Sequence, residues 1–150
     1  MGKFGSRWLG DNFSTQEYMG LSVTGVMAQN IAGFPLSGGD ICGFNGNATA
    51  ELCTRWYAVG AFQPFSRNHN NYGNSNQAPW SYQVQNIIPI RKAMLAKLSL
   101  MRYYQTEMTK LHLSGGTFYK PLFFSFPLND GAYEAPQLNI MLGESLKLSV

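Results

Sequence analysis

Gly38-Gly39-Asp40-Ile41-Cys42-Gly43-Phe44 is the stretch that decides the fold, and Trp8-Leu9-Gly10-Asp11-Asn12 precedes it by thirty residues. Each string places an acidic residue among glycines and aromatic residues, after a short apolar element and before a predicted helix or turn. The loop around His69 has a similar setting. Chemistry in parallel α/β units gathers at the carboxyl ends of strands. The three positions therefore predict a parallel α/β unit with a site at those ends.

Capping residues and apolar periodicity predict the helices. Ser14-Thr15-Gln16-Glu17 matches a capping box with Ser14 as the cap, and Thr49 and Asn86 are candidate caps of two further helices. Gly33 and Gly115-Gly116 are helix terminators. The predicted elements are helices over 14–31, 49–62 and 86–113, a long polar loop over 63–80, and strands ending at 40–41 and covering 119–126. A last apolar segment covers 138–142.

Composition narrows the class of protein. The chain has 150 residues, of which 45% are hydrophobic and 13% charged, enough for one modest core. Its 11 Lys and Arg are scattered and its net charge is only +3, which argues against a nucleic-acid partner. No apolar run is long enough for a membrane span, and no signal-peptide pattern is present. Two cysteines alone do not form a zinc site, so we expect no metal and no cofactor.

From the residues alone, each candidate keeps two interpretations. Asp11 is either a turn residue that helps to start a helix, or a carboxyl group partly buried beside Trp8, with a raised pKa, that acts as a general acid. Asp40 has the same ambiguity. His69 is either an ordinary loop histidine or a hydrogen-bond donor to a ligand. The aromatic content of 14% fits a sugar-stacking surface as well as a large core.

Five motifs follow one another along the chain. They are Trp8-Leu9-Gly10-Asp11-Asn12, Gly38-Gly39-Asp40-Ile41-Cys42-Gly43-Phe44, Glu51-Leu52-Cys53-x-Arg55-Trp56, Gly60-Ala61-Phe62 and Pro64-Phe65-Ser66-Arg67-Asn68-His69-Asn70. In this order they resemble family 31 glycoside hydrolases, and in particular the branch that contains maltases and lysosomal acid α-glucosidase. The similarity extends through Pro121-Leu122-Phe123 and Met141-Leu142-Gly143, so it covers nearly the whole chain. Gly39 stands where the family usually has alanine.

The resemblance implies an α/β fold, the C-terminal strands and helices of a (β/α)8 TIM barrel, with residues 1–150 as one fragment of the catalytic barrel and no second domain. It implies retaining hydrolysis of terminal α-linked glucose in oligosaccharides. Asp11 matches the family's acid/base. Trp8, Asp40, Phe44 and His69 match residues that line the first sugar subsite, and Arg67 is expected to support its loop.

The family's nucleophile lies on an earlier strand, in a Trp-x-Asp-Met-type string that is absent from these 150 residues. A full barrel needs about 250 residues. We therefore expect a chain that carries the acid/base half of the site and is inactive alone. A catalytically dead sugar-binding remnant is the alternative, and complementation by a separate chain with the first half-barrel is a further possibility.

Cys42 and Cys53 coincide with a disulfide typical of the maltase and lysosomal branch, which the endoplasmic-reticulum glucosidase branch usually lacks. Two reduced core thiols are the alternative. A disulfide implies an oxidising compartment. Asn47-Ala48-Thr49 is a glycosylation sequon, whereas Asn12-Phe13-Ser14, although it also matches, lies beside the expected acid/base. These features predict that the parent protein is secreted or lies in a lysosomal or endomembrane lumen.

Overall fold

A computed structural model describes residues 4–150 and contains three parallel strand segments. Strand β1 (Arg7–Trp8) pairs with β2 (Ser37–Gly38), and β3 (Asp40–Ile41) pairs with β4 (Arg67–Asn68). Gly39 separates β2 from β3, so residues 37–41 form the middle segment. The predicted parallel α/β arrangement is confirmed. The described residues form part of such a unit and not a closed barrel.

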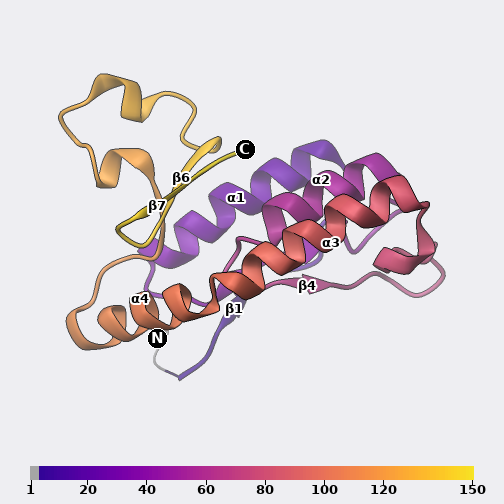
Figure 1. Cartoon of the computed structure of the whole chain (residues 1–150), viewed down its shortest axis with the longest axis horizontal. Helices are drawn as coiled ribbons and strands as arrows, with labels where there is room; N and C mark the ends of the chain where they lie inside the picture. Colours follow the sequence, from indigo (N-terminus) through magenta and orange to yellow (C-terminus); the bar gives the residue numbers. More distant parts are fainter. Residues whose placement is uncertain (1–3) are drawn as a thin grey trace.

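Helix α1 (Gln16–Ile31) connects β1 to β2, and α2 (Ala50–Gly60) connects β3 to β4 (Figure 1). Thr49 caps α2 as predicted, its hydroxyl accepting from the Leu52 amide at 3.2 Å. The prediction that Ser14 caps α1 is wrong. Thr15 is the cap, because the Ser14 amide already donates to Asn45 O and keeps Ser14 in the loop before the helix.

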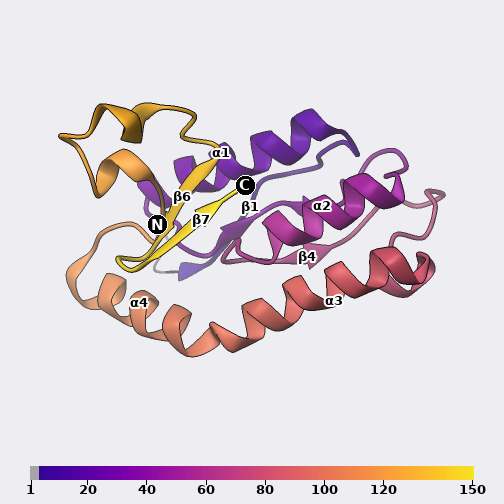
Figure 2. The same ribbon diagram turned by 45° about the horizontal axis from the view of Figure 1, so that its top comes forward.

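The predicted helix over 86–113 is two helices, α3 (Val84–Ser99) and α4 (Met101–Ser114), preceded by a short 3-10 turn (Pro79–Ser81). They follow one another along one side of the molecule (Figures 1 and 2). The break at Leu100 lets Ile90 of α3 and Tyr104 of α4 enter different core clusters. Asn86 does not cap α3, because its side-chain amide donates to Thr54 of α2. Among residues 4–150, no helix combines the length and apolarity needed to cross a bilayer.

A second sheet follows α4, and it is antiparallel, which the sequence pattern did not indicate. It contains β5 (Tyr119–Pro121), β6 (Asn139–Leu142) and β7 (Leu146–Ser149) in that order. The strand predicted over 119–126 stops at Pro121, because Leu122–Phe124 forms a 3-10 turn. Residues 122–138, with another 3-10 turn (Asp130–Tyr133), form the loop that extends beyond β6 and β7 at the upper left of Figure 1.

One core joins this second sheet to the helices. Asn30, at the end of α1, accepts a hydrogen bond from the Tyr119 amide (2.9 Å) and donates to Ser37 Oγ (3.2 Å). A single buried side chain therefore ties α1, β2 and β5 together. The surrounding buried cluster consists of Val23, Val26, Met27, Val59, Tyr104, Phe118, Tyr119, Ile140 and Leu142.

Two side chains place the turn that leads into β4. Gln63 is fully buried, accepts from the Gly39 amide at 3.3 Å and donates to Ser22 Oγ at 2.9 Å. From α3, the Lys97 ammonium donates to Gln63 O at 2.6 Å and to Ser66 Oγ. Burial lowers the pKa of Lys97 to about 8. Polar contacts to α1 and α3 thus fix the turn before a strand only two residues long.

Gly38 lies where the turn before β4 approaches too closely for a side chain. A Cβ atom there would lie 1.9 Å from Phe65 O, whereas at Gly39 the nearest atom would be 3.5 Å away. We expect Gly38→Ala to lower the free energy of unfolding by about 3 kcal/mol. Gly39→Ala, the matched control, should change it by less than about 1 kcal/mol, because the alanine methyl fits. Urea unfolding measures both, and equal stability of the two variants would contradict the packing argument.

Candidate active site

The strand ends bring Trp8, Asp40 and Arg67 together. Asp40 and Arg67 are register partners in β3 and β4. The Arg67 Nε donates to Asp40 Oδ1 at 2.7 Å, and Arg67 Nη2 lies 2.5 Å from the same oxygen. The Arg67 guanidinium also lies over the Trp8 ring, with Cζ 4.9 Å from its centroid. Arg67, expected only to support its loop, therefore links an acidic side chain to an aromatic one.

Asp40 is fully buried, and this determines its electrostatics. Burial raises the pKa of Asp40 above its ordinary value, and the Arg67 guanidinium opposes that shift through its hydrogen bond and its charge. Among the described residues, Asp40 Oδ2 has no hydrogen-bond partner. The carboxyl group therefore presents one paired oxygen and one oxygen that can still accept a hydrogen bond.

Phe44 and His69 form a second pair at the same ends, with ring centroids 5.3 Å apart. Asn12 fixes the Phe44 side of this pair. Its Oδ1 accepts from the Phe44 amide and its Nδ2 donates to Asp40 O, each at 2.9 Å. Because Asn12 is buried and both ends of its amide are used, the sequon at this position is not available for a glycan.

Asp11 follows Trp8 directly along the chain but is not drawn into either pair. Its side chain is exposed, whereas the general-acid interpretation assumed partial burial, and it forms no hydrogen bond or ion pair within residues 4–150. It contributes to a pocket of about 200 Å³ with Tyr18 and Ser22 of α1. Its carboxylate is therefore accessible to a ligand, and its acid/base role stays a prediction.

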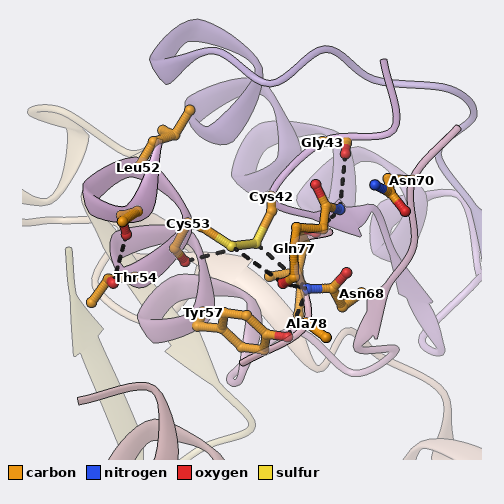
Figure 3. Close-up of a disulfide and its surroundings, with 12 residues drawn as sticks. Cys42, Gly43, Leu52, Cys53, Thr54, Tyr57, Asn68, Asn70, Gln77 and Ala78 are labelled. Carbon is orange, nitrogen blue, oxygen red and sulfur yellow. Dashed lines mark hydrogen bonds between the residues drawn. A yellow bond between two sulfur atoms is a disulfide. The ribbon is translucent and has the colours of Figure 1, made fainter. Parts of the chain in front are cut away.

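The predicted disulfide between Cys42 and Cys53 is present, with the Cα atoms 4.6 Å apart and both residues fully buried (Figure 3). It anchors the chain between Asp40 and Phe44 to helix α2. Cys42 has a φ of 77°. The cross-link holds the strand end at a residue whose backbone lies in the left-handed region, which disfavours a side chain.

Two residues that support the site, Asn12 and Gln77, were not predicted from the sequence to have this role. Asn12 stood in a quoted motif, beside Asp11, and that was the one signal for it. Gln77, which donates to main-chain carbonyls near the strand ends, lies in a polar loop with no pattern that marks it. In the part of the chain that the structure describes, no group of three or more His, Cys, Asp or Glu gathers that could hold a metal ion.

Removal of Arg67 should leave the buried Asp40 carboxylate without its ion-pair partner. We expect Arg67→Met to lower the free energy of unfolding by about 1–3 kcal/mol near neutral pH, because Asp40 is fully buried whereas the Arg67 side chain is partly exposed. A carboxyl group whose pKa is raised in the folded protein contributes stability at low pH, where it is protonated. That stability is lost as the pH rises through the folded-state pKa. Without Arg67 that value rises further.

The loss in free energy of unfolding caused by Arg67→Met should therefore be smaller at about pH 4 than at about pH 7. Urea titrations at the two pH values measure it, with Arg91→Met, on an exposed position of α3, as control. A deficit that does not change with pH would contradict the role given to Asp40.

Comparison with known proteins identifies the family. Residues 1–107 match the model of the glycosyl hydrolases family 31 TIM-barrel domain. An alpha-glucosidase of Schizosaccharomyces pombe is 41% identical over 147 residues, which are 97% of this chain and 15% of that protein. Lysosomal alpha-glucosidase of Rattus norvegicus is 40% identical over 126 residues, 84% of this chain and 13% of that protein.

Solved structures agree. The crystal structure of a family 31 alpha-glucosidase from Bacteroides thetaiotaomicron superposes with a TM-score of 0.88 at 30% identity, covering 98% of this chain and 25% of that one. The chain thus spans a quarter or less of the proteins that it matches. The strand-end motifs, the family model and these relatives lead to one conclusion: the chain belongs to glycoside hydrolase family 31.

Proposed function

We propose that this chain supplies the acid/base half of a retaining α-glucosidase site. The observation that carries the proposal is the gathering of the Asp40–Arg67–Trp8 cluster and the Phe44–His69 pair at the carboxyl ends of three parallel strands, with Asp11 accessible beside them. The substrate class is an oligosaccharide with a terminal α-linked glucose. Membership of family 31 and the α-glucosidase relatives support this assignment.

In this proposal Asp11 protonates the glycosidic oxygen as the bond to glucose breaks, and later takes a proton from the water that releases the sugar. Its exposed carboxyl can reach a substrate. The Trp8 and Phe44 rings offer apolar faces to the sugar ring. Asp40 Oδ2, which lacks a partner among residues 4–150, accepts from a sugar hydroxyl, and the His69 imidazole donates to another.

A retaining mechanism also needs a nucleophilic carboxylate about 5–5.5 Å from the acid/base. Asp40 is a poor candidate, because one of its oxygens is held by Arg67 and the other accepts from a sugar hydroxyl in this proposal. We therefore infer that the 150-residue polypeptide does not complete the reaction alone.

We also propose that residues 1–150 act as one structural unit. The core cluster and the Asn30–Tyr119 hydrogen bond, which join the second sheet to α1, support it. A buried disulfide and the lysosomal relative support a lumenal or secreted location for the parent protein.

The inactivity has a direct test. The purified 150-residue chain, assayed with a chromogenic α-glucoside, should show no turnover above the uncatalysed rate. The losses typical of a missing nucleophile are about 10⁴-fold or more. Asp11→Asn is the companion variant. Turnover by the unmodified chain that disappears in Asp11→Asn would contradict the inference that the carboxylates of this chain are insufficient.

Sugar binding without catalysis is the second candidate function, and the pre-formed clusters favour it because neither needs a nucleophile. Calorimetry with an iminosugar should then detect binding, with Kd in the millimolar range or tighter. Trp8→Ala and Phe44→Ala should each weaken binding by about fivefold to tenfold, the loss of one aromatic contact of about 1 kcal/mol. Tyr72→Ala is the control, because Tyr72 is an equally aromatic but fully exposed loop residue. A folded sample without detectable binding would exclude this function.

A further inference from the structure

Gln77 is a buried side chain that joins two loops of the site. It lies in the irregular segment after β4 and is 4% exposed. Its Nε2 lies within hydrogen-bond distance of three main-chain oxygens, those of Ile41 (3.3 Å), Gly43 (3.1 Å) and His69 (3.2 Å). Ile41 ends strand β3, and Gly43 lies in the loop that leads from it to Phe44. One amide group therefore bridges the segment before Phe44 and the segment that carries His69.

The main chain of Gln77 is itself held in place. Asn68 Nδ2 donates to Gln77 O at 2.9 Å and to the Tyr57 hydroxyl at 2.7 Å. Figure 3 shows this arrangement directly beside the Cys42–Cys53 disulfide, with the Gln77 side chain extending toward Gly43. Because both the main chain and the side chain of Gln77 form hydrogen bonds, the bridge between the two segments is held in place.

Other contacts also join the Phe44 loop to the segment around His69, but they differ from Gln77 in strength or in burial. The disulfide joins the Phe44 loop to α2, and Asn68 Nδ2, from the His69 segment, lies 3.6 Å from its Cys42 Sγ, a weak acceptor. The Asn71 amide and Asn74 Nδ2 both donate to Phe44 O at 2.9 Å, but from residues beyond His69 and closer to solvent. The Gln77 bridge is shielded from water, and loss of its donors would leave buried carbonyls without a hydrogen bond, which costs more than the loss of an exposed one.

We propose that Gln77 is a positioning residue, which holds the Phe44 and His69 rings in contact at the edge of the sugar subsite. The contact that it maintains is the 5.3 Å separation of the two ring centroids. The ring contact itself is observed, and its use in sugar recognition rests on the proposed function. Gln77 touches no substrate in this proposal, and acts through the backbone on either side of it.

Proton–carbon NMR spectra of the imidazole groups test the proposal in the intact chain. The sequence has two histidines, His69 and His112. His69 feels the ring current of Phe44, whereas His112 lies exposed on α4 and serves as an internal reference. Phe44→Leu shows where the His69 signals lie without that ring.

Gln77→Glu keeps the size of the side chain but, when ionised, has no hydrogen to donate. We expect its His69 signals to move to the Phe44→Leu positions while the His112 signals stay in place. Gln105→Glu, with the same change at an exposed position of α4, should leave both histidines unchanged. If Gln77→Glu does not fold, as judged by the His112 signals, Gln77→Met replaces it. A folded variant with His69 at its original position overturns the proposal.

Iminosugar calorimetry on the same proteins separates this proposal from the proposed function. Where the unmodified chain binds the iminosugar, Gln77→Glu should weaken binding by several-fold, and unchanged affinity counts against the positioning role. If the unmodified chain binds no iminosugar while its His69 signals still respond to Gln77, sugar recognition by this chain is refuted and the positioning of the ring pair by Gln77 is supported.

Discussion

The ion pair between the buried Asp40 and the partly exposed Arg67 is the interaction on which the rest of the site depends. Its two members stand opposite one another in β3 and β4, and the guanidinium also covers the Trp8 ring. A charged carboxylate in a fully buried position is tolerated only with such a partner. The pair therefore fixes the strand register and shapes the surface offered to a ligand.

Around this pair, short strands are held by side chains instead of by long ladders. None of the four parallel strands exceeds two residues, so backbone pairing alone cannot position the site. Buried side-chain hydrogen bonds between segments distant in sequence supply the additional contacts, and they come from Asn12, Gln63 and Gln77. Such side chains are sensitive points, because a buried amide must satisfy both its donors and its acceptor.

Much of the architecture was predictable from local patterns. Helices α1 and α2 follow from apolar periodicity and Thr49 was identified as a cap, because these signals act within a few residues. Strand β4, the break at Leu100 and the antiparallel second sheet were not predictable. Each depends on distant partners, such as Lys97 and Gln63 for the turn before β4 and the two core clusters for the helix break.

The sequence by itself determined the family, the candidate residues and the cysteine pair, because the identity and order of the motifs can be read without the folded structure. Only the tertiary structure decided which residues meet. It placed Arg67 on Asp40, left Asp11 exposed, and brought the Gln77 amide to the main-chain oxygens of Gly43 and His69. The physical reason is that burial and hydrogen bonding between residues as far apart as Asn12 and Phe44 arise only when the chain is folded.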